Sequence, residues 1–153
     1  MTDELPGVAR IVDVGGKDAT ERVAVAECVV TMTAEAVEHL VAGTRKGDPI
    51  EAARIAGVMG VKRTPDLLPF CHPIAVTGAE VRVEPDATAG TIRVETTVRA
   101  SDRTGVEMEA LTAAAVAALS LYDTAKEFDR AARIDGLRLL RKSGGKSGDY
   151  HAR

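Results

Sequence analysis

The chain contains no tryptophan, two phenylalanines and two tyrosines. Proteins that bind single-stranded nucleic acids stack the bases on aromatic side chains, so a binding platform of that kind is not expected here. The two cysteines, Cys28 and Cys71, lie far apart and belong to no Cys-x-x-Cys or Cys/His zinc pattern. A disulfide framework is therefore excluded, and no metal site is expected.

The sequence also lacks a targeting segment, a membrane span and a large excess of either charge. Its N-terminus has no basic region followed by an apolar one, so no signal peptide is expected. No apolar run approaches the ~18 residues that a membrane-spanning helix needs. A net charge of -3 gives no general reason to expect nucleic acid or an anionic membrane as a partner. The expected location is the cytoplasm.

What the sequence does contain is the composition of one globular domain. Its 153 residues are long enough to bury a core, and 45% are hydrophobic and 28% charged. We expect a single domain over residues 1–153, with flexible segments at 1–9 and 142–153.

The pattern of the chain predicts alternating strands and helices. The predicted strands cover residues 10–14, 21–32, 74–84, 91–100 and 134–140. The predicted helices cover 34–42 after the N-cap Thr33 and 50–62 after the N-cap Asp48, with Pro49 at its first position. A third helix, of about six turns, is predicted within the stretch 105–129, with Gly105 just ahead of it. A short helical turn is expected at 64–66. From residue 21 this β-α-β-β-α-β order predicts an α+β, ferredoxin-like fold, an antiparallel sheet with helices packed on one face.

The helix predicted near the C-terminus is unusual because charged residues flank its Ala- and Leu-rich middle. Glu107 and Glu109 open it, and Asp123 and Lys126 lie on one face near its end. The two glutamates can be explained by a favourable interaction with the positive end of the helix dipole, and Asp123 and Lys126 can be explained as a surface ion pair. A buried helix needs none of these four charges, so a functional site is an equally good interpretation.

Other candidate groups are open to two interpretations each. Cys71 and His72 lie in a loop between two prolines, where a histidine is more often structural than catalytic and a nucleophilic cysteine would need a base. The glycine-rich tail around Lys142 and Lys146 lacks the spacing of a Walker A motif. It is either a disordered end or a lid that carries these lysines to an anionic ligand.

Seven motifs occur in an order that resembles a known family. They are Lys46-Gly47-Asp48, residues 53–57, residues 62–64, Cys71-His72-Pro73, residues 104–112, Tyr122-Asp123 with Lys126, and residues 142–148. Together they resemble the molybdenum cofactor biosynthesis protein C family (MoaC), the cyclic pyranopterin monophosphate synthases, over nearly the whole chain from about Ile11 to Asp149.

The resemblance implies an enzyme of the phosphorus–oxygen lyase class. It would convert 3',8-cyclo-7,8-dihydroguanosine 5'-triphosphate, supplied by a radical S-adenosylmethionine enzyme, to cyclic pyranopterin monophosphate and pyrophosphate. The resemblance also implies a homohexamer, a trimer of dimers, with sites between subunits. No cofactor is required, although Mg²⁺ accompanying the triphosphate is compatible with the sequence. The alternative is a non-catalytic homologue that binds a nucleotide-like ligand or acts as a scaffold.

Site residues transfer from the family motif by motif. The implied catalytic residues are Asp123, Lys126, Lys142, Lys46 and Glu107. The implied substrate-binding residues are Phe70, Cys71, His72, Met108, Glu109, Arg22 and Lys17. Two departures, Phe70 for the usual Leu and Thr124-Ala125 for the usual Met-Cys, remove no charge but are expected to reshape the pocket wall.

The spacing of the two acidic ends has a geometric consequence. Fourteen residues separate Glu109 from Asp123, which corresponds to roughly 21 Å along one helix, with the two side chains within about 40° of the same direction. One ligand cannot easily touch both ends. If both are site residues, either an extended triphosphate spans them or the two ends belong to different subunits, and we expect the second.

Overall fold

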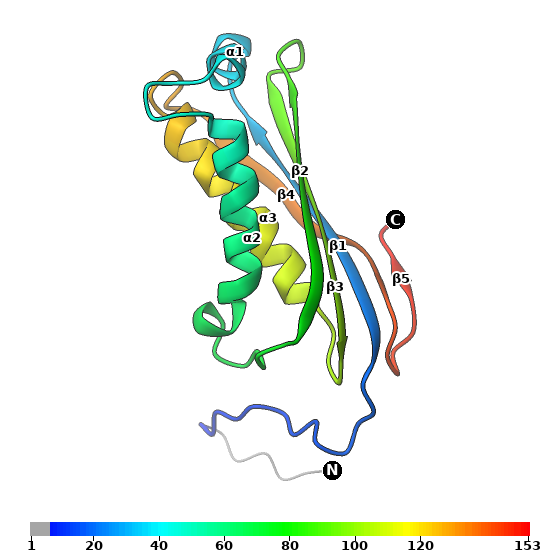
Figure 1. Ribbon diagram of the computed structural model, residues 1–153. Coiled ribbons are helices and arrows are strands. Elements are labelled where there is room, and N and C mark those ends of the chain that lie inside the picture. Colours follow the sequence, from blue (N-terminus) through cyan, green and yellow to red (C-terminus); the bar gives the residue numbers. More distant parts are fainter. Residues whose placement is uncertain (1–6) are drawn as a thin grey trace.

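A computed structural model describes residues 7–153 as an antiparallel sheet covered on one side by helices (Figure 1). The sheet has five strands in the order β2-β3-β1-β4-β5. The strands are β1 (Thr20–Thr31), β2 (Val76–Asp86), β3 (Thr91–Asp102), β4 (Arg133–Ser143) and β5 (Tyr150–His151), and the helices are α1 (Ala34–Ala42), α2 (Pro49–Leu67) and α3 (Glu107–Ala125). The α+β, ferredoxin-like prediction is confirmed.

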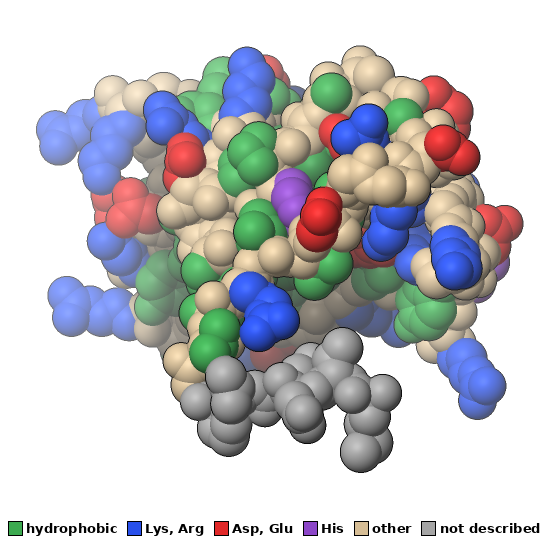
Figure 2. Space-filling view, turned by 90° about the horizontal axis from the view of Figure 1, so that it is seen from below, with side chains coloured by type: hydrophobic (Ala, Val, Ile, Leu, Met, Phe, Trp, Pro, Cys, Tyr) green, Lys and Arg blue, Asp and Glu red, His purple; other side chains and the backbone are tan. Residues whose placement is uncertain are grey.

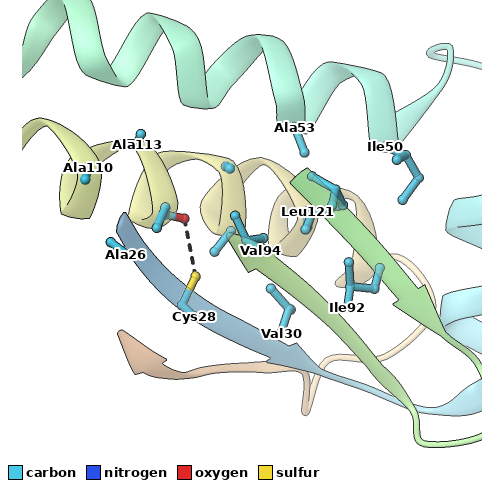
Figure 3. Packing of buried hydrophobic residues seen from close by; sticks show 14 of the residues in the cluster. Ala26, Cys28, Val30, Ile50, Ala53, Ile92, Val94, Ala110, Ala113 and Leu121 are labelled. Atoms are coloured by element: carbon cyan, nitrogen blue, oxygen red, sulfur yellow. Dashed lines mark hydrogen bonds between the residues drawn. The ribbon is translucent and has the colours of Figure 1, made fainter. Parts of the chain in front are cut away.

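The core lies between the sheet and α3. Alternate residues of the central strands β1 and β3 face the helices and are fully buried, as a strand with one covered face requires. Figure 3 shows that α3 contributes mainly alanines to this layer. Because alanine is small, the helix backbone lies close enough for two side chains of the sheet to reach its carbonyls: the Cys28 thiol donates to Ala114 O (3.4 Å) and the Thr96 hydroxyl donates to Ala110 O (2.7 Å).

The two predicted N-caps are confirmed. The Thr33 hydroxyl accepts a hydrogen bond from the Ala36 amide (3.2 Å), and one Asp48 carboxylate oxygen accepts from the amides of Ile50 and Glu51. Pro49 occupies the first position of α2, where its missing N–H costs nothing. These caps fix where α1 and α2 begin, and so they position the loop between them, which carries Lys46.

One predicted element in the first half of the chain is wrong, and another ends later than predicted. The strand predicted at residues 10–14 does not form. The side chains of Ile11 and Val12 are exposed, so no apolar burial favours a strand there. The helix predicted from residue 50 forms, but it does not end near Lys62: it continues to Leu67 through Pro65, so the helical turn expected at 64–66 is part of it. The Thr64 side chain is fully buried and its hydroxyl donates to Gly60 O (2.9 Å), so packing of this last turn compensates for the hydrogen bond that proline cannot make.

The C-terminal half differs from the prediction at element ends. α3 is shorter than residues 105–129, because residues 126–129 turn away from the helix. β4 extends beyond Leu140 to Ser143, and Tyr150–His151 adds a strand that was not predicted, pairing with Arg141 and Lys142. The predicted flexibility of 142–153 stays a prediction. Of segment 1–9, residues 7–9 are exposed without secondary structure, and 1–6 lie outside the described residues.

The two long helices run in opposite directions (Figure 1). The start of α2 and the end of α3 therefore lie at one end of the molecule, which we call the upper end. The loop 68–75 and the start of α3 lie at the opposite, lower end. No helix in the described part of the chain is both long and apolar enough to cross a membrane.

Glycines let α2 approach its neighbours closely. A Cβ at Gly57 would lie 2.9 Å from a Val81 methyl and 3.2 Å from Ala113 O, and one at Gly60 would meet Val116 and Ala113 at 3.2–3.3 Å. These distances leave no room for a larger side chain, so the glycines fix the spacing between α2, α3 and β2.

We therefore expect Gly57→Val to lower the free energy of unfolding by about 2 kcal/mol or more, since the buried methyl groups must displace Val81 and α3. Ala52→Val on the exposed side of the same helix is the matched control and should cost only about 0.5 kcal/mol through helix propensity. Urea denaturation measures both. Equal effects of the two substitutions would contradict the close packing.

Candidate active site

Charged groups gather at both ends of α3. Glu107 and Glu109 lie in its first turn at the lower end, and Asp123 lies in its last turn at the upper end. The helix is continuous between them, so the rise per residue separates Glu109 from Asp123 by roughly 21 Å. The two ends therefore form separate clusters within one chain.

The lower cluster joins α3 to the C-terminal part of the sheet. Lys142 Nζ lies 3.2 Å from Glu107 Oε1 and donates a hydrogen bond to Ser147 Oγ (2.6 Å). Lys142 is held on β4 opposite Ala24, and both side chains of the ion pair are largely covered. Partial burial makes this pair stronger than a surface pair.

Two glycines bring the tail against Arg22. Gly144 and Gly145 have positive φ angles of 90° and 81°, which a residue with a side chain rarely adopts. A Cβ on Gly144 would overlap the Glu21 carbonyl, and one on Gly145 would overlap the Arg22 guanidinium. Arg22, Glu107 and Lys142 consequently line the same recess.

Glu109 is the most unusual carboxylate of the chain. Its side chain is only 2% exposed, and Oε2 has no hydrogen-bond partner among the described residues. Burial raises the pKa of Glu109 to about 7, and the neighbouring charges of Glu107 and Asp102 act in the same direction. A carboxyl group that titrates near neutral pH is suited to give or take a proton.

Glu109 faces a groove of about 590 Å³ at the lower end. The last turns of α2 form one wall, with Val61, Lys62 and Pro65, and residues 73–79 form the other. Figure 2 looks onto this end of the molecule and shows Lys and Arg side chains interspersed with acidic and hydrophobic ones. The lower end is thus a mixed surface and not a uniformly basic one.

Cys71 lies close to this groove. Burial raises the pKa of the Cys71 thiol, and the charge of Glu109 raises it further. Because a nucleophilic cysteine needs a lowered pKa, the environment of Cys71 disfavours that role. The other cysteine, Cys28, is deep in the core, where burial raises its pKa to about 11.

The upper cluster consists of two ion pairs. Asp123 Oδ1 lies 2.7 Å from Lys126 Nζ, and Lys46 Nζ lies 2.8 Å from Glu127 Oε1. Hydrogen bonding to Lys126 lowers the pKa of Asp123, with a smaller contribution from Lys46, and hydrogen bonding to Glu127 raises that of Lys46. These exposed pairs contribute little to stability but leave their charges accessible.

Comparison with known proteins is decisive for the family. The MoaC family profile matches residues 11–145. The chain belongs to the MoaC family. It is 51% identical over 148 residues to a cyclic pyranopterin monophosphate synthase of Parvibaculum lavamentivorans, which covers 96% of this chain and 92% of the relative. The proteins of that name from Roseiflexus sp. and Roseiflexus castenholzii are 52% and 53% identical, covering 94% of this chain and 92% and 91% of theirs.

The structure brings most of the family-matched residues into the two clusters. Arg22, Glu107 and Lys142 meet at the lower end, where Glu109 and Cys71 also lie. Lys46, Asp123 and Lys126 meet at the upper end.

The remaining predicted residues lie outside these contacts. Lys17 lies in an exposed turn before β1, where its amide donates a hydrogen bond to Val14 O (3.0 Å). In the described part of the chain its side chain makes no hydrogen bond or ion pair with either cluster. Phe70 and Met108 are exposed at the lower end, and His72, in the same loop as Phe70, is half-buried. Of the three positions that depart from the family, Phe70, Thr124 and Ala125, the last is fully buried in the core.

Some neighbours of the site could not be found from the sequence. Glu127 contacts Lys46 across 81 positions of the chain, and Ser147 reaches Lys142 only because the tail folds back at the two glycines. No local pattern marks either residue. In the described part of the chain, no three His, Cys, Asp or Glu side chains converge in a way that could hold a metal ion.

The raised pKa of Glu109 predicts a pH-dependent stability. An unfolded glutamate titrates near ~4.3, so between about pH 4 and pH 7 the folded state holds the extra proton and stability falls as pH rises. Glu109→Gln removes this titration and serves as the reference. Between about pH 4 and pH 7, the free energy of unfolding of wild type should therefore fall by roughly 1–3 kcal/mol more than that of the variant. Urea denaturation at several pH values measures the difference, and parallel curves would contradict a buried, titrating Glu109.

Proposed function

We propose that the protein is a cyclic pyranopterin monophosphate synthase of molybdenum cofactor biosynthesis. The observation that carries the proposal is the 51–53% identity to relatives of that name over nearly the whole of both chains. The reaction converts 3',8-cyclo-7,8-dihydroguanosine 5'-triphosphate to cyclic pyranopterin monophosphate and pyrophosphate. It belongs to the phosphorus–oxygen lyase class.

The two clusters suit the two parts of this chemistry. Opening and rebuilding the purine ring needs proton transfers. Glu109, whose pKa is about 7, can donate a proton, and Asp123, whose pKa is lowered, is ionised and can accept one. Closing the cyclic phosphate breaks the bond between the α-phosphorus and the pyrophosphate oxygen. Cations such as Lys46, Lys126 and Lys142 would stabilise the charge on the phosphate oxygens and on the leaving group.

We further propose that each site is built from two copies of the chain. A ligand of this size cannot easily touch Glu109 and Asp123 of one α3, because roughly 21 Å separates them. The lower cluster of one copy and the upper cluster of another would face the same ligand. A homohexamer, a trimer of dimers with sites between subunits, satisfies this requirement.

The remaining parts of the proposal concern the setting of the enzyme. The substrate would come from a radical S-adenosylmethionine enzyme, because an unactivated carbon has to be joined to the purine. Mg²⁺ would enter with the triphosphate and not as a resident metal. The cytoplasm is the proposed location.

The test is release of pyrophosphate from the purified cyclised substrate. Wild type should release it, and Asp123→Asn should reduce kcat by about 100-fold or more because an acid/base group is lost. Asp86→Asn is the same change at the turn of the β2–β3 hairpin, where the carboxylate accepts a hydrogen bond from the Ala89 amide, and it should leave the rate unchanged. Binding without turnover in wild type would favour the alternative, a non-catalytic ligand-binding homologue. A fully active Asp123→Asn variant would refute the role of Asp123.

A further inference from the structure

The loop 68–75 carries Phe70, Cys71 and His72 from the end of α2 to the start of β2. At its far end the Ala75 amide donates a hydrogen bond to Asp102 Oδ2 (3.0 Å). The other carboxylate oxygen of Asp102, Oδ1, accepts from the Arg103 amide (2.7 Å). Asp102 is the last residue of β3, so its side chain ties the loop to the turn that leads into α3.

This hydrogen bond is the loop's connection to the rest of the sheet. The backbone–backbone hydrogen bonds of residues 68–75 are local: for example, Cys71 N donates to Leu68 O (3.2 Å), and Ile74 O accepts from Val76 N (3.0 Å). Regular pairing between β2 and β3 begins only at Val76, opposite Ala100. Within the described residues, the hydrogen bond from Ala75 to the Asp102 side chain therefore joins the loop to β3 just before the regular backbone pairing of β2 with β3 begins.

Asp102 also holds a third segment. Its carbonyl oxygen accepts a hydrogen bond from Arg22 Nε (3.3 Å), and Arg22 is the residue against which Gly144 and Gly145 fold. The loop 68–75 and the turn before α3 thus meet at the Asp102 side chain, and the C-terminal tail is linked to the Asp102 backbone through Arg22. Hydrogen bonds from two backbone amides lower the pKa of Asp102, so it is ionised at neutral pH.

The residue that Asp102 holds is part of the groove wall. Ala75 lines the groove opposite Glu109, together with Pro73 and Ile74. A shift of the loop at Ala75 would therefore move Cys71 and His72 relative to Glu109. Small displacements of this kind lower kcat/KM when substrate groups must meet fixed partners.

We propose that Asp102 is a positioning residue of the active site: its side chain holds the loop carrying Cys71 and His72 in place against the turn that leads into α3. The inference rests on the proposed function. Asp102 is not among the residues transferred from the family, and it need not touch the substrate.

Asp102 also contributes to the electrostatics of the groove. The charged and titratable groups around Glu109 are Glu107 on its own helix, Asp102 at the end of β3, Cys71 in the loop, and Lys62 of α2 across the groove. Because the charge of Asp102 raises the pKa of Glu109, removing that charge should lower it.

The experiment compares Asp102→Ala and Asp102→Asn with Asp86→Ala in the full-length protein. Asp86 is the matched control, since it accepts an amide hydrogen bond from Ala89 (3.0 Å) at the opposite end of the same two strands. Three quantities are measured: hydrogen exchange at the Ala75 amide, kcat and KM for the cyclised substrate, and the pH midpoint of kcat/KM.

In Asp102→Ala the Ala75 amide should exchange about 10-fold faster or more, because its acceptor is lost. KM should rise about 10-fold with a smaller change in kcat. The pH midpoint should move down in both Asp102 variants. Asp102→Asn keeps one acceptor oxygen, so its exchange rate at Ala75 and its KM should lie between those of wild type and Asp102→Ala. Asp86→Ala should change neither the exchange rate, nor kcat and KM, nor the pH midpoint.

Unchanged exchange at Ala75 in folded Asp102→Ala, or a KM equal to that of wild type, would overturn the positioning role. Faster exchange without a shift of the pH midpoint would also overturn it, because a merely structural residue would behave in that way. If Asp102→Ala does not fold, Asp102→Asn decides by the same criteria. A wild-type protein without turnover refutes the proposed function, and the exchange at Ala75 then decides separately whether Asp102 holds the loop.

Discussion

The packing of one alanine-rich helix on the sheet is the constraint on which the rest of the structure depends. The buried face of α3 is made almost entirely of alanine, so its backbone lies against β1 and β3, and glycines of α2 close on it from outside. A helix held in this way along its whole length cannot bend to bring its ends together. The separation of Glu109 from Asp123 is therefore a fixed property of the fold, and it argues for a site completed by a second copy.

The same helix gives its two carboxylates opposite environments. Glu109 is buried at the wall of the groove, and this burial raises its pKa to about 7. Asp123 points to solvent beside Lys126, which lowers its pKa. Pairs of titratable groups whose environments push their pKa values apart are a general sign of an acid and a base with different tasks. The fold thus separates the two groups in proton affinity as well as in space.

Much of this arrangement could be predicted from the sequence, because it depends on local patterns. The caps at Thr33 and Asp48, the order of the elements and the two charged ends of α3 follow from residue types and spacing. The parts that could not be predicted depend on contacts between distant segments. The continuation of α2 through Pro65 depends on the burial of Thr64, and the contact of Lys46 with Glu127 exists only after folding. The strand predicted at 10–14 is wrong for the opposite reason: its local pattern suits a strand, but most of its side chains stay exposed in the folded protein.

The central claim is that the two ends of α3 serve one site in different copies of the chain. Mixing two variants tests it directly: Glu109→Gln and Asp123→Asn, each inactive alone, are dissociated, combined in equal amounts and reassembled. Random assembly places two intact ends together in about a quarter of the sites, so up to about a quarter of the wild-type pyrophosphate release should return. A mixture that reassembles fully and stays inactive would contradict the claim.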